Sequence, residues 1–88
     1  MPSATHSYYD WQLSTLLLAY DAVEPLDRDD LAGLEARQRR VELELHDLAH
    51  AILPPDYLAD PGRDFPPAVV IDLTRATLRR AAAIVGLI

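Results

Sequence analysis

Apolar residues recur every three or four positions along most of this chain, in three stretches separated by proline-containing breaks. Such spacing is typical of α-helices with one buried face, and no stretch alternates apolar and polar residues as an exposed strand does. The pattern predicts helices over residues 8–23, 28–53 and 67–86. The predicted fold class is therefore all-α: an antiparallel bundle of three helices, with a stiff proline-rich connector over residues 54–67.

Local signals mark the ends of the predicted helices. Ser7 is the expected N-cap of the first helix and Asp27 that of the second, because both side chains can accept a hydrogen bond from a free backbone N–H. Pro25 ends the first helix and Pro66 precedes the third, since proline lacks the N–H that a helix interior needs. Residues 1–7 are expected to form a tail.

The second helix carries the most regular apolar seam. The residues of this seam are alternately three and four positions apart, which is the heptad spacing of a helix that packs along another helix. Gln38 is its only polar member. The seam consists of Leu31, Leu34, Gln38, Val41, Leu45, Leu48 and Ile52.

The other two helices are apolar on more than one side. The first is expected to bury Tyr9, Leu13, Leu16, Tyr20 and Val23, and the third to bury Val70, Leu73, Ala76, Ile84 and Leu87. Arg80 falls inside the second of these stripes, where it needs a carboxylate partner or a position at the edge.

Something else must cover the remaining apolar side chains, because two neighbouring helices cannot surround a third helix that is apolar on most sides. Either the connector folds back, with Tyr57, Leu58 and Phe65 against the helices, or another chain covers them. The second possibility predicts a protein partner, either a second copy in a homodimer or a larger complex. The residues expected at that interface are Trp11, Leu18, Leu43, Ile71, Leu78, Arg80, Ile84, Val85, Leu87 and Ile88.

The 88 residues are expected to form a single domain. Their composition excludes several classes of partner and location. The net charge is −6 and all eight basic residues are arginine, so a nucleic-acid partner is not expected. The longest apolar tract holds four charges, Asp72, Arg75, Arg79 and Arg80, which excludes a membrane span. The first residues lack a positively charged segment followed by an apolar run, which predicts a cytoplasmic location.

The candidate chemistry is confined to one face of the second helix. Glu42, His46 and His50 lie four residues apart, so their side chains can be neighbours, and one carboxylate with two imidazoles could bind zinc. Both histidines point away from the predicted seam. The usual paired-histidine motif has glutamate after its first histidine, where this chain has Asp47. We therefore expect solvated or interface histidines, with no metal and no cofactor.

Two function classes follow from these features. The favoured one is a non-catalytic helical module: an assembly subunit, an adaptor, or a small bacterial or phage regulator. The alternative is a small all-α enzyme whose site forms between subunits or on the histidine face. In either case the clustered arginines are expected to pair mainly with carboxylates of neighbouring helices.

Overall fold

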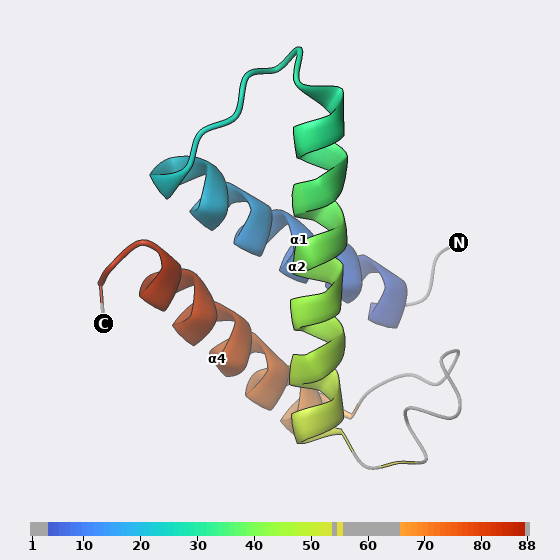
Figure 1. Cartoon of the computed structure of the whole chain (residues 1–88). Helices are drawn as coiled ribbons and strands as arrows, with labels where there is room; N and C mark the ends of the chain where they lie inside the picture. Colours follow the sequence, from blue (N-terminus) through green and yellow to red (C-terminus); the bar gives the residue numbers. More distant parts are fainter. Residues whose placement is uncertain (1–3, 54, 56–65, 88) are drawn as a thin grey trace.

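The computed structural model describes residues 4–53, 55 and 66–87, with side chains from residue 8 onward. Within these residues the chain forms three helices and no strand: α1 (Ala4–Val23), α2 (Leu31–Ile52) and α4 (Pro67–Ile84). α1 and α4 lie side by side and run in the same direction, and α2 crosses both (Figure 1). The prediction of an all-α three-helix bundle is confirmed. No helix in the described ranges is both long enough and apolar enough to span a membrane.

The first two helices begin at different residues than predicted. α1 begins at Ala4, so Ser7 lies inside the helix and does not cap it. α2 is capped by Asp30, whose Oδ1 accepts a hydrogen bond from the Gly33 amide at 2.9 Å. Asp27 instead shapes the preceding turn, because its Oδ1 accepts from the Asp29 amide at 3.1 Å. The absent side chain of Gly33 leaves room for the cap, since a β-carbon there would collide with the Asp30 carboxylate.

α4 also ends before its predicted boundary, and the reason is local. Gly86 has a φ of 81°, a left-handed conformation that favours glycine. The Leu87 amide donates to the Ala82 carbonyl at 2.8 Å, and the Gly86 amide donates to the Ala83 carbonyl at 3.2 Å. This pair of bonds is a Schellman motif, which satisfies the last carbonyls of the helix and stops it at Ile84.

The core lies where the three helices cross. Leu16 and Tyr20 of α1 pack against Val41 and Leu45 of α2. The partly buried residues around them are Leu13, Leu17, Leu48, Ala81 and Ile84. In α1 the prediction was wrong for Tyr9 and Val23, which are 39% and 46% exposed.

The predicted seam of α2 is buried only in its second half. Leu31 is 69% exposed and Gln38 is also exposed, whereas Arg37, one residue away, is buried. Figure 1 shows the reason: the first turns of α2 extend beyond α1 and α4. Gln38 is therefore not a polar break inside the core, which corrects the sequence-based prediction.

Hydrogen bonds between side chains join α1 to α4. The Gln12 Nε2 donates to the Thr77 Oγ1 at 2.9 Å, and both residues are buried. One end of the same interface pairs the Tyr8 and Thr74 hydroxyls at 2.8 Å. Thr77, not Ala76, takes the buried position, and Leu87 lies exposed beyond the helix end. The interface of these parallel helices is thus partly polar.

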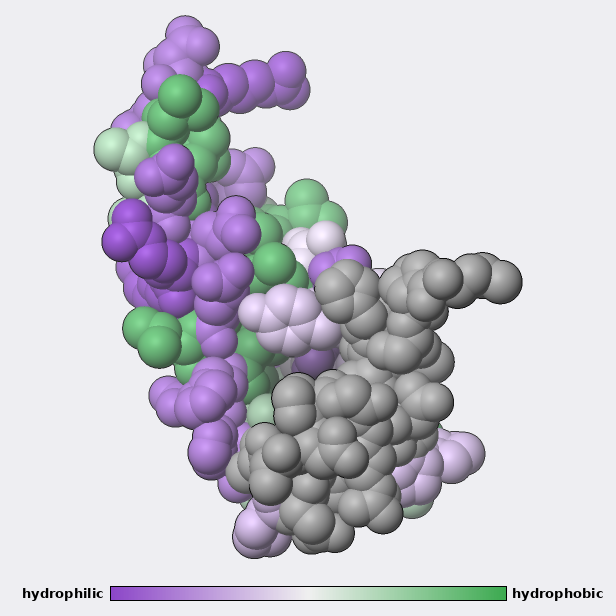
Figure 2. All heavy atoms as spheres, turned by 90° about the vertical axis from the view of Figure 1, so that its right-hand side faces the viewer, coloured by the Kyte–Doolittle hydropathy of each residue, from purple (hydrophilic) through white to green (hydrophobic). Residues whose placement is uncertain are grey.

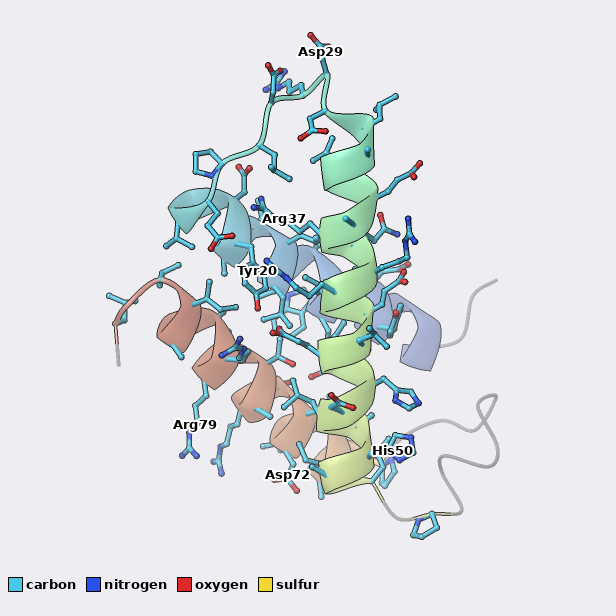
Figure 3. All side chains as sticks on the ribbon, viewed as in Figure 1. Tyr20, Asp29, Arg37, His50, Asp72 and Arg79 are labelled. Carbon is cyan, nitrogen blue, oxygen red and sulfur yellow. The ribbon has the colours of Figure 1, made fainter. Side chains whose placement is uncertain are left out.

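Arg37 joins the end of α1 to α2. Its Nη2 donates to the backbone carbonyl of Glu24, and its guanidinium also faces the carboxylates of Asp21 and Glu24 at 4.0 and 3.7 Å. A cation at this point interacts favourably with the negative end of the α1 dipole. Figure 3 shows Arg37 pointing into the space between the two helices.

Candidate functional site

A broad groove runs between α1 and the second half of α2. We call it groove one; its volume is about 610 Å³, and Leu43, Leu45, Leu53 and Leu73 supply much of its apolar lining. Arg39, Glu42 and His46 add polar groups, together with Tyr9, Gln12 and Ala49. This volume lies within the roughly 300–1,000 Å³ that is usual for small-molecule sites.

A second groove lies beside the projecting half of α2. We call it groove two; its volume is about 500 Å³ and it is lined by Ser14, Leu17, Leu18, Asp21, Leu34, Arg37 and Gln38. Leu18 is 71% exposed here, and Leu34 is also exposed. Of the apolar residues in the α2 seam, Leu34 borders this groove.

The residues predicted at an interface fall into three groups. Leu18, Leu43, Ile71, Leu78 and Leu87 are more than half exposed, and Trp11 is somewhat less so. Ile84 is partly buried against the core, and Val85 is half-buried at the helix end. Arg80 is engaged within the chain, as described below. Ile88 and the connector residues Tyr57, Leu58 and Phe65 lie outside the described ranges.

The exposed apolar residues do not gather in one place. Leu18 belongs to groove two and Leu43 to groove one. Ile71 and Leu78 lie two turns apart on α4, with both side chains open to solvent. Figure 2 shows one side of the molecule, on which hydrophobic side chains lie open among the polar residues. Among the described residues, exposed apolar side chains therefore lie in both grooves and on the outer side of α4.

His46 and His50 contact each other on an exposed side of α2. Their Nε2 atoms are 3.0 Å apart and their ring centroids 4.2 Å apart. Figure 3 shows His50 extending from α2 on the side opposite to α4. Glu42 instead accepts a hydrogen bond from Gln38 Nε2 at 3.3 Å. In the part of the chain that the structure describes, no three histidine or carboxylate side chains converge as ligands of one metal ion.

Replacing His46 and His50 together with glutamine is expected to leave the melting temperature and partner binding unchanged. Two imidazoles supply only half of the four ligands of a typical structural zinc site. We therefore expect protein dialysed without chelator to hold far less than one zinc per chain, as measured by mass spectrometry of the metal. Stoichiometric zinc in the natural sequence and its loss in the double variant would contradict this prediction.

A cluster of charged and aromatic side chains joins all three helices. Tyr20 donates its hydroxyl proton to Glu44 Oε1 at 2.5 Å, and Arg80 Nη2 lies 2.9 Å from the same oxygen. Arg80 also donates to the Tyr20 hydroxyl at 3.1 Å, and the Arg40 guanidinium lies 4.7 Å from the Tyr20 ring centroid. Arg80 thus has the carboxylate partner that its position in an apolar stripe requires. Glu44 was not among the predicted site residues, and that position of Arg80 was the signal that could have led to it.

The electrostatics of this cluster favour the ionised carboxylate. Burial by itself raises the pKa of Glu44, but hydrogen bonds from Arg80 and Tyr20 and the positive charges of Arg80 and Arg40 outweigh it, so the net pKa is lowered. Burial, followed by the bond to Glu44, raises the pKa of Tyr20. The hydrogen bond to Glu44 is the main reason that the pKa of Arg80 is raised. The cluster is therefore a stable ion pair with a neutral tyrosine, which suits a structural role.

Acidification is expected to weaken the protein through Glu44. A carboxyl with a lowered folded-state pKa contributes stability that is complete above its unfolded pKa, about 4.3, and is lost as the pH falls through the folded pKa. The stability difference between the natural sequence and Glu44→Gln should therefore shrink below about pH 5. Urea denaturation across that range measures it, with Glu35→Gln, an exposed position on the same helix, as the control. An unchanged difference would contradict the prediction.

Comparison of the chain with protein-family models, with characterised proteins and with solved structures found no match.

Proposed function

We propose that the chain is a non-catalytic helical module that binds other protein chains through its apolar helix faces, as an assembly subunit, an adaptor or a small regulator. Exposed leucine or isoleucine lies on three surfaces that could each receive a partner: groove one, groove two and the outer side of α4. Single exposed apolar residues are normal on soluble proteins, whereas grouped ones commonly mark binding sites. The observation that best supports the proposal is in groove two, where the exposed Leu18 and Leu34 lie together with the half-buried Leu17.

The size of the chain adds to this argument. Full burial of an exposed leucine or isoleucine contributes roughly 1.5–3 kcal/mol. A domain of this size has a total stability of about 5–10 kcal/mol. Covering a few of these side chains in a complex would therefore contribute a free energy comparable to the stability of the domain itself. The proposed partner is a second copy or a larger protein complex, and the proposed location is the cytoplasm.

Site-specific photo-cross-linking tests this proposal. A photoreactive phenylalanine analogue is placed at Leu18, at Leu43 or at Leu78, one position per apolar surface, and irradiated in cells. We expect a defined protein adduct from at least one of these positions, and none from the exposed control position Glu35. Adducts absent from all three positions, or equally abundant at Glu35, would overturn the proposal.

A small all-α enzyme remains the second candidate, because groove one combines a volume suited to a small molecule with Arg39, Glu42 and His46. Such a site would use the arginine for an anionic substrate or the histidine and carboxylate for a metal. Thermal shift measurements with zinc, magnesium and small carboxylates or phosphates test it. A rise in melting temperature that is lost in Arg39→Ala would favour this candidate over the first.

A further inference from the structure

The outer side of α4 has the spacing of a helix-packing seam that no described element covers. Its residues are alternately four and three positions apart, which is the heptad spacing of a coiled-coil seam. They are Ile71, Arg75, Leu78, Ala82 and Val85. Ile71 and Leu78 are more than half exposed, Arg75 is exposed, and Ala82 and Val85 are half-buried. A small residue such as Ala82 lets a second helix approach closely. The seam thus has the shape and spacing to accept one more helix.

The charges beside this seam are arranged in a self-complementary way. Asp72 follows Ile71 and Arg79 follows Leu78, so both lie along the same edge, about 10 Å apart along the helix. Figure 3 shows both side chains on the side of α4 away from α1. Neither makes an ion pair with any other residue that the structure describes. They are too far apart to pair with each other within one helix.

We propose that a second copy of the chain packs on this seam, with α4 antiparallel to α4 of the partner about a two-fold axis near Arg75. In this arrangement Asp72 of each copy faces Arg79 of the other, which forms two equivalent ion pairs across a closed interface. Parallel packing would instead bring like charges to the same level and repel. This inference rests on the proposed function and names the partner for one of its three surfaces.

Arg75 adds a cost to this packing. It occupies a seam position near the axis, where it approaches its own counterpart in the partner. A charged residue at such a position lowers the stability of the assembly. Arg75→Leu should therefore tighten the dimer, whereas substitutions at Asp72 and Arg79 should weaken it.

Charge reversal followed by mixing tests the pairing directly. Asp72→Arg alone and Arg79→Asp alone each place like charges at both contacts, and we expect each to raise the dimer dissociation constant about tenfold. An equimolar mixture of the two variants restores both attractive pairs in a heterodimer. Sedimentation equilibrium at low salt measures all three samples. Glu35→Arg and Arg28→Asp, which change the net charge equally at exposed positions away from α4, are the matched controls.

The outcomes separate this inference from the proposed function. Dimers weakened in each variant and recovered on mixing support the antiparallel pairing, because only a contact between chains can be rescued by mixing. Equal behaviour of the variants and their controls overturns it, as does a natural sequence that stays monomeric at high micromolar concentration. In either of those cases an adduct at Leu18, Leu43 or Leu78 would leave the proposed function standing, and the absence of adducts from all three positions would remove it as well.

Engineered cysteines give a second readout that does not depend on charge. The chain has no cysteine of its own, so introduced thiols have no competitor. Asp72→Cys mixed with Arg79→Cys should form a disulfide-linked heterodimer faster than either variant links with itself. Equal rates in all three samples would overturn the proposed register.

Discussion

Replacing Leu45 with alanine is expected to lower the free energy of unfolding by about 2–5 kcal/mol. Leu45 is 4% exposed and packs in the cluster with Leu16, Tyr20 and Val41, where all three helices meet. Truncation removes the buried methyl groups and leaves a cavity that a small core cannot easily close. Because the total stability of such a domain is about 5–10 kcal/mol, this loss is a large share of it and should lower the melting temperature markedly.

Leu43 provides a matched control on the same helix. It is two residues from Leu45 but 68% exposed, so its replacement with alanine should cost less than about 0.5 kcal/mol. Urea denaturation followed by circular dichroism measures both variants, at a protein concentration low enough to keep the chain monomeric. A similar loss for the two variants would show that the buried side of α2 has been assigned to the wrong residues.

The buried half of α2 could be predicted from sequence, whereas its exposed half could not. Periodic spacing reveals which side of a helix is apolar, and it placed Val41 and Leu45 correctly. It does not reveal whether a neighbouring helix is long enough to reach that side. Leu31 lies in the projecting turns and stays exposed, although its spacing equals that of Leu45. The relative offset of α1 and α2 is a tertiary property that depends on where the loop places each helix.

Helix boundaries were predicted less well because equivalent capping residues compete. Asp27 and Asp30 both precede an apolar periodic stretch and both can accept a backbone hydrogen bond. Two later features favour Asp30: Gly33 leaves room for its carboxylate, and Asp27 stabilises a turn of its own. The start of α1 shows the same limit, since Ser7 could cap a helix that begins at Tyr8 but lies inside α1.

The exposure of Leu18, Leu43 and Leu78 could be predicted from the pattern, but the polar contacts inside the bundle could not. Leu18, Leu43 and Leu78 stand outside the main stripes, and exposure follows directly from that position. A buried polar residue looks the same in sequence as a solvated one until its partner is known. For this reason the apolar pattern assigned the buried position to Ala76 and not to Thr77. The partner of Thr77, Gln12, lies on a helix far away in the sequence.

Replacing Thr77 with valine is expected to lower the free energy of unfolding by about 1–3 kcal/mol, although the two side chains have nearly the same shape. Thr77 is completely buried, and its hydroxyl accepts the hydrogen bond from Gln12 while donating to the Leu73 carbonyl at 2.8 Å. Valine keeps the volume but leaves the buried Gln12 amide without its acceptor. The cost is that of an unsatisfied buried donor, not that of a cavity.

The double variant Gln12→Leu/Thr77→Val distinguishes these two causes. Leucine removes the amide that valine leaves without an acceptor, so the pair should recover most of the lost stability and can exceed that of the natural sequence. Thr74→Val is the control, because Thr74 is only half-buried and water can replace it as the partner of Tyr8. Chemical denaturation of the natural sequence, Gln12→Leu, Thr77→Val and the double variant gives the coupling energy between positions 12 and 77. Additive losses would mean that Gln12 and Thr77 stabilise the α1–α4 interface independently, through packing and not through their hydrogen bond.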